Sequence, residues 1–102
     1  MVVRISKGQF QRERTVEVER LNADSEQELR SVLGAMPGLV HYYVGIDREV
    51  GMITNVSLWD SLEHARGLDG LPEMLALRAR AEELGVGFET ITNHEVQWSI
   101  SP

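Results

Sequence analysis

Residues 54–65 have the sequence TNVSLWDSLEHA, which predicts a β-strand followed at once by a helix. Side chains alternate along a strand, so Asn55, Ser57 and Trp59 share one face of it. A strand face that packs against helices is usually filled by apolar side chains. Two polar groups and an indole in a row are unusual for packing alone, so we expect this face to line a pocket.

The helix that follows this strand has a recognisable start. Asp60 is placed to cap its first turn, and Glu63 three residues later is placed to close a capping box.

Apolar periodicity and the Gly and Pro residues predict the remaining elements. The helical regions are 11–36, either as one helix or with a kink or restart near Asn22, then 61–66 and 72–84; the strands are 1–6, 39–47, 52–59 and 87–100.

The order strand, helix, strand, strand, helix, strand predicts an α+β domain of ferredoxin-like split βαβ topology over residues 1–102. Its sheet is antiparallel and has helices on one face only. Both faces of the strands over 39–47 and 52–59 nevertheless carry many apolar or aromatic side chains. We therefore expect a second copy of the chain to cover the other face, most simply in a two-fold homodimer.

Composition excludes several classes of protein. The net charge of −6 argues against a nucleic-acid binder, which would carry a basic face. No apolar run is long enough to span a bilayer, and the start MVVRISKG has no apolar segment of signal-peptide length, so we expect a soluble cytoplasmic protein without membrane partners. The absence of cysteine excludes disulfides, thiolate catalysis and cysteine metal sites.

Four segments resemble the dimeric α+β barrels of the antibiotic biosynthesis monooxygenase type. They are MVVRISKG, PGLVHYYVGID, NVSLWDSLEHA and GVGFETITNHEVQW, which together cover most of the chain. The resemblance implies a dimeric barrel. In the quinone-forming members it implies oxidation of a small aromatic or polyketide-like phenol by O₂ without metal, flavin or other cofactor.

The same resemblance implies roles for individual residues. Asn55 and Trp59 match an asparagine and a tryptophan, four residues apart, that help bind the substrate. Arg78 or Arg80 could supply an arginine of the long helix, and we prefer Arg78 because it borders the inner apolar stripe. Some members carry a tyrosine in the segment after the tryptophan; here His64 is the only ring between residues 60 and 66, and it is the candidate proton-handling group.

Each candidate also has a structural interpretation. Trp59 is the type of residue that fills a core, with its N–H bonded to a carbonyl. The Asn55 amide could bond backbone, His64 could be a partly exposed ring, and Arg78 or Arg80 could pair with Glu82 or Glu83 in solvent. Three scattered histidines lack the spacing of a metal site.

The sequence therefore leaves two functions open. One is a cofactor-independent monooxygenase that uses Asn55, Trp59, Arg78 and His64. The other is a non-catalytic or accessory barrel that binds a small apolar ligand or only dimerises. A haem-degrading enzyme is a weaker third alternative, because Asp69 and Lys7 lie near the positions where those relatives need a histidine and an asparagine.

Overall fold

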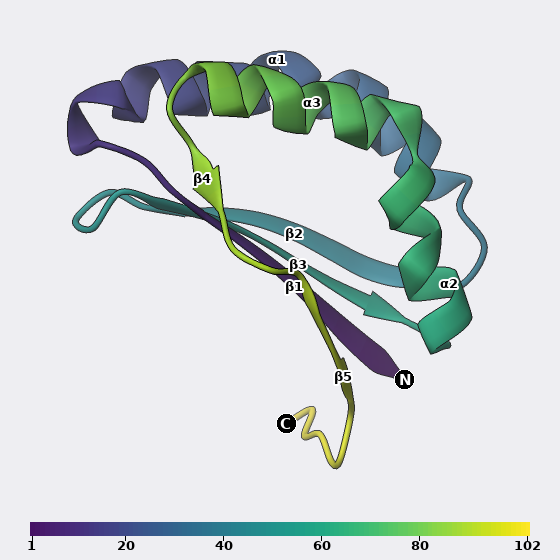
Figure 1. The fold of residues 1–102 in the computed structure, drawn as a ribbon. Coiled ribbons are helices and arrows are strands. Elements are labelled where there is room, and N and C mark those ends of the chain that lie inside the picture. The colour runs from purple at the N-terminus through teal and green to yellow at the C-terminus, as the bar shows by residue number, and fades with distance from the viewer.

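A computed structural model describes all residues from 1 to 102 and shows one antiparallel sheet with every helix on the same face (Figure 1). The sheet has five strands in the order β2-β3-β1, with both β4 and β5 paired to the free edge of β1. This topology confirms the predicted ferredoxin-like α+β fold. The strands are β1 Val2–Gln9, β2 Leu39–Asp47, β3 Met52–Trp59, β4 Gly87–Phe88 and β5 Thr92–Glu95, and the helices are α1 Thr15–Gly34, α2 Leu62–Arg66 and α3 Pro72–Glu83.

The first half of the chain differs from the prediction in two respects. Strand β1 runs to Gln9 because its whole length pairs with β3, from Val2 opposite Trp59 to Gln9 opposite Met52. Helix α1 is continuous from Thr15 to Gly34, so of the two alternatives the chain does not start a new helix near Asn22. Ser25, three residues further along α1, is buried and accepts a hydrogen bond from Arg80 of α3.

The predicted closing strand over 87–100 is two short strands separated by residues 89–91. β4 pairs with the end of β1, and β5 pairs with its beginning. Residues 96–102 form no strand, and Trp98 and Ile100 are exposed. The predicted end of this strand at residue 100 is therefore wrong, because the strand ends at Glu95.

The start of α2 also differs from the predicted capping box. The N-cap is Ser61, whose hydroxyl accepts a hydrogen bond from the His64 backbone N–H at 3.2 Å. The Asp60 carboxylate contacts the His64 ring instead. After α2, Gly67–Gly70 forms a 3₁₀ turn that leads into α3.

Strand alternation separates a helix-facing side of the sheet from a bare side. Ile53, Asn55, Ser57 and Trp59 of β3 face the helices, and residues 54, 56 and 58 face away. The buried apolar residues form two clusters. One contains Val2, Leu29, Leu33, Trp59, Ala65, Leu68 and Leu77, and the other contains Phe10, Val18, Ile53, Ala81 and Val86.

None of the helices has both the length and the apolar character needed to cross a membrane.

Candidate functional site

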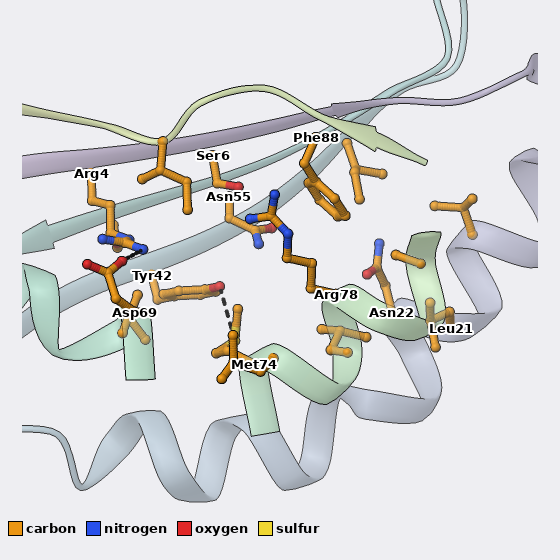
Figure 2. A pocket seen from close by; sticks show the side chains of 18 residues that line it. Arg4, Ser6, Leu21, Asn22, Tyr42, Asn55, Asp69, Met74, Arg78 and Phe88 are labelled. Carbon is orange, nitrogen blue, oxygen red and sulfur yellow. Dashed lines mark hydrogen bonds and ion pairs between the residues drawn. The ribbon is translucent and has the colours of Figure 1, made fainter. Parts of the chain in front are cut away.

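A cavity of about 160 Å³ lies between the helix-facing side of the sheet and helices α1 and α3 (Figure 2). Its wall includes residues of both apolar clusters, such as Leu68 and Leu77 of one and Val18 and Ala81 of the other. The cavity therefore lies between the two apolar clusters, and side chains of the core do not fill the space above β3. Most of the lining is apolar, with a small set of polar side chains pointing inward, a pattern typical of a small-molecule site.

Asn55 and Arg78 reach this cavity from opposite walls. Asn55 comes from β3 and makes no side-chain hydrogen bond within the chain, and Arg78 comes from α3 and forms no ion pair. The Arg78 guanidinium carbon lies 4.6 Å from the centre of the Phe88 ring, which holds the cation over an aromatic face (Figure 2). Arg80 does not line the cavity and donates to the Ser25 hydroxyl at 3.3 Å. Both cavity residues therefore have donors available to a ligand.

The sequence analysis missed Arg4, which is the buried cation of the site. Its side chain is 7% exposed, and its Nη2 lies 2.7 Å from Asp69 Oδ1 in the turn after α2. Its Nη1 donates to the Ala65 carbonyl oxygen at 3.4 Å. Because β1 pairs with β3 in the register that sets Arg4 opposite Ser57, the guanidinium points to the helix-facing side. A charged residue between the apolar Val3 and Ile5 at an inward position of β1 was the available signal.

Tyr42 adds a phenol hydroxyl to the same wall. Its hydroxyl donates to the Met74 Sδ at 3.9 Å, a weak acceptor (Figure 2). Burial raises the pKa of Tyr42 to about 12, although the positive charge of Arg4 opposes the shift. At neutral pH the group is therefore a protonated donor and not a base.

The Tyr42 pKa predicts a loss of stability in alkali. The folded-state pKa is raised, so the unfolded chain loses this proton first, from about pH 10 upward, and stability falls until pH passes the folded value of about 12. Two pKa units correspond to about 3 kcal/mol as an upper bound. We expect denaturant unfolding of Tyr42→Phe to lack this component of the decline between pH 10 and 12. Parallel curves for both proteins would contradict the assignment.

Trp59 does not line the cavity. It is fully buried, and its indole N–H donates to the Ser57 hydroxyl at 2.8 Å. The one donor of the indole is therefore bonded within the chain, and the ring packs in the core without reaching the cavity. Ser57 itself does line the cavity, so Trp59 supports the wall from behind.

His64 also lies away from the cavity. Its Nδ1 is 2.6 Å from Asp60 Oδ1, and this hydrogen bond is the main reason that the pKa of the Asp60 carboxyl is lowered. A Cβ at Gly38, which has φ +82°, would overlap the His64 ring, so the ring packs closely on the turn before β2. The structure does not bring His64 together with Asn55 and Arg78; the ring contacts Asp60 and the turn before β2 instead.

Comparison with known proteins is informative at the level of structure. No protein-family model and no curated protein matches the sequence. A crystal structure of a candidate antibiotic biosynthesis monooxygenase from Deinococcus radiodurans matches all of this chain and 98% of its own, with TM-score 0.76 and 21% identity.

Two further solved structures match almost as completely. A protein from Mycobacterium tuberculosis matches with TM-score 0.70 and 18% identity over 98% of each chain. SnoaB, a cofactor-independent oxygenase from Streptomyces nogalater, matches with TM-score 0.69 and 14% identity over 99% of this chain and 97% of its own. At these identities the likeness concerns the backbone. The chain therefore has the fold of the antibiotic biosynthesis monooxygenases, as its four sequence segments led us to expect.

Proposed function

We propose that this chain is a cofactor-independent monooxygenase that oxidises a small aromatic phenol with O₂ in the cavity between the sheet and helices α1 and α3. The observation that carries the proposal is the pair of unoccupied donors, Asn55 and Arg78, on opposite walls of one apolar cavity. A purely apolar ligand would leave both donors without partners, which is unfavourable in a dry site. The fold that the chain shares with SnoaB supports the same proposal.

The chemistry requires a phenol that becomes a phenolate. The phenolate gives one electron to O₂, and the resulting radical and superoxide combine to form a carbon–oxygen bond. The peroxide anion formed in this way takes up a proton to become a hydroperoxide, whose carbon–hydrogen and oxygen–oxygen bonds then break to release water and leave a quinone carbonyl. One oxygen atom of O₂ stays in the product, the other leaves as water, and no external reductant is consumed.

The residues of the cavity contribute charge and shape to this reaction. The Arg78 cation favours the phenolate over the phenol, and the Asn55 amide can donate to an oxyanion. Tyr42 remains protonated and can donate a further hydrogen bond. An interior cavity of about 150 Å³ holds one benzene ring, so the present cavity of about 160 Å³ suits a single phenol ring.

The test is aerobic turnover of a panel of single-ring and fused-ring phenols by protein freed of metal and flavin. O₂ consumption and quinone absorbance are followed together, with heat-denatured protein as the control. Protein-dependent O₂ uptake with one quinone formed per O₂ is the expected result. Binding of phenols without any O₂ uptake would instead favour the accessory, ligand-binding barrel.

We further propose that the active form is a homodimer joined through the bare side of the sheet. No helix covers this side (Figure 1). Tyr43 is 60% exposed there and pairs with the outward-facing Val56. A sheet face that carries Val3, Ile5, Val56, Leu58 and Tyr43 is an apolar surface of the kind that marks an interface.

Val56→Glu tests this interface. Val56 lies between Ile5 of β1 and Tyr43 of β2, so a carboxylate there would be buried in the dimer but could reach water in a single copy. We expect wild type and Val56→Thr to sediment as dimers and Val56→Glu to sediment at half the mass. A monomeric wild type, or a Val56→Glu variant that stays dimeric, would argue against this interface.

A further inference from the structure

Asp69 is the only carboxylate on the wall of the cavity, and no histidine lines it. The other polar side chains of the wall are amides, hydroxyls and arginines, which donate hydrogen bonds but do not take up a proton at neutral pH. The Tyr42 phenol is no exception, because burial keeps it protonated. Asp69 is therefore the one side chain of the cavity that can act as a base.

The neighbours of Asp69 hold its carboxylate in a fixed orientation. Arg4 Nη2 lies 2.7 Å from Asp69 Oδ1, and the Arg4 guanidinium also donates to the Ala65 carbonyl oxygen. Leu68, the residue before Asp69, is buried in the core and anchors the turn that carries the carboxylate. Only Oδ1 is bonded within the chain, so Asp69 Oδ2 is free to accept a proton.

The two members of this ion pair differ in their contact with water. The Arg4 side chain is 7% exposed, whereas the Asp69 side chain is 59% exposed and lines the cavity as well. Asp69 therefore lies where the cavity meets solvent. A proton that it takes up inside the cavity can also be exchanged with water outside.

Arg4 and Asp69 lie at one end of the cavity, away from the donors of the proposed oxyanion site. Figure 2 shows the Tyr42 ring between this pair and the side chains of Asn55 and Arg78. A phenol ring whose oxygen is bound by Asn55 and Arg78 therefore directs its opposite edge toward Asp69. That edge holds the carbon para to the oxygen, which is one of the positions where a phenoxyl radical can combine with superoxide.

We propose that Asp69 is the catalytic base that completes the oxidation and that Arg4 is the residue that positions it. Once O₂ has added to the para carbon and the peroxide has been protonated, Asp69 Oδ2 removes the hydrogen of that carbon as a proton. The electron pair of the C–H bond forms the second carbonyl, and the O–O bond breaks. The departing hydroxide takes the proton back from Asp69 and leaves as water. This inference rests on the proposed function and assigns one of its steps, in which O₂ is the only oxidant.

The test separates addition of O₂ from formation of the quinone. Protein in excess over the phenol is mixed with O₂, so that each molecule turns over once, and O₂ uptake and quinone absorbance are recorded as two phases. The substrate is the phenol with a free para carbon that wild type oxidises fastest, with 2,6-dimethoxyphenol tried first. Deuterium at the para carbon is expected to slow the quinone phase and to leave O₂ uptake unchanged.

Asp69→Asn removes the base but keeps an amide oxygen that can accept a hydrogen bond from Arg4, so the buried cation retains a partner. We expect O₂ uptake at the wild-type rate and a quinone phase slowed by about 10²-fold, the usual effect of losing a general base. An organic hydroperoxide, detected with ferrous xylenol orange, should accumulate between the two phases. Quinone formation at the wild-type rate in the folded variant, or equal slowing of both phases, would overturn the assignment.

Arg4→Lys tests the positioning role and does not depend on the folding of Asp69→Asn. A lysine keeps the positive charge but cannot reproduce the two contacts of the guanidinium, so the quinone phase should again slow while O₂ uptake does not. Wild-type rates in both phases would remove Arg4 from the step. Asp24→Asn makes the same change of charge at an exposed residue of α1 outside the cavity and should alter neither phase. Absence of O₂ uptake by wild type with every phenol would overturn this inference together with the proposed function.

Discussion

Asn55→Ala is expected to lower turnover of an oxidisable phenol by about 10²–10³-fold, the usual effect of removing one oxyanion donor from an enclosed site. The amide has no partner within the chain and lines the cavity, so its donor is free to follow charge that develops on the substrate oxygen. The loss should fall mainly on kcat, since the donor acts more strongly on the anion than on the neutral phenol. Initial rates of O₂ uptake over a range of phenol concentrations separate kcat from KM.

Two further variants test whether the effect of Asn55→Ala comes from the loss of its hydrogen-bond donor. Asn55→Asp preserves the size of the side chain but replaces the donor with a negative charge, so it should be at least as inactive. Thr54→Val alters the adjacent residue, which points to the opposite side of the sheet, and should keep wild-type turnover. If Asn55→Ala kept full turnover while folded, Asn55 would have no part in catalysis.

Much of the fold could be predicted because local patterns and tertiary packing agree. Strands β2 and β3 begin and end at the predicted residues, since a Pro-Gly turn and a short polar hairpin bound them. The closing strand was predicted too long because its sequence stays β-like beyond Glu95. Only the pairing with β1 shows that its two halves bond to different parts of that strand.

The residues of the candidate site could be predicted where the pattern of a single strand or helix is enough to place them. Strand alternation places Asn55 on the helix-facing side, and the apolar stripe of α3 favours Arg78 over Arg80; of the two arginines, Arg78 lines the cavity and Arg80 bonds Ser25. Arg4 and Tyr42 could not be found in the same way, because their convergence depends on the register of β1 and β2 against β3. A single sequence does not give that register.

For Trp59, the family resemblance and the local geometry point to different roles. The resemblance favours a contact with the substrate, and the local geometry favours packing in the core. Ser57 stands two residues earlier on the same strand face, so its hydroxyl is within reach of the indole N–H. A donor satisfied inside its own strand has nothing left to offer a ligand. Trp59 therefore lies behind the cavity wall, with its N–H bonded to the Ser57 hydroxyl.

Trp59→Ala is accordingly expected to act on stability, lowering the free energy of unfolding by about 3–5 kcal/mol. Trp59 is 0% exposed and packs in the cluster that joins β1, β3, α1 and α2. Its removal leaves a large void and deprives the Ser57 hydroxyl of its hydrogen-bond donor. For a domain whose total stability is of order 5–15 kcal/mol, that loss would leave a substantial unfolded fraction at moderate temperature. Urea unfolding followed by far-ultraviolet circular dichroism measures the change.

Trp98 provides the matched control, because the chain has only one other tryptophan and it is 81% exposed. Trp98→Ala is expected to change the unfolding free energy by less than about 1 kcal/mol, as for most surface substitutions. Trp59→Phe, which keeps most of the buried volume but lacks the N–H, should lie between the two and retain phenol turnover. Turnover of Trp59→Phe separates a packing role from a catalytic one. If the variant is active, the position requires only the volume of an aromatic ring. If the variant is stable but inactive, the indole N–H takes part in the chemistry of the site.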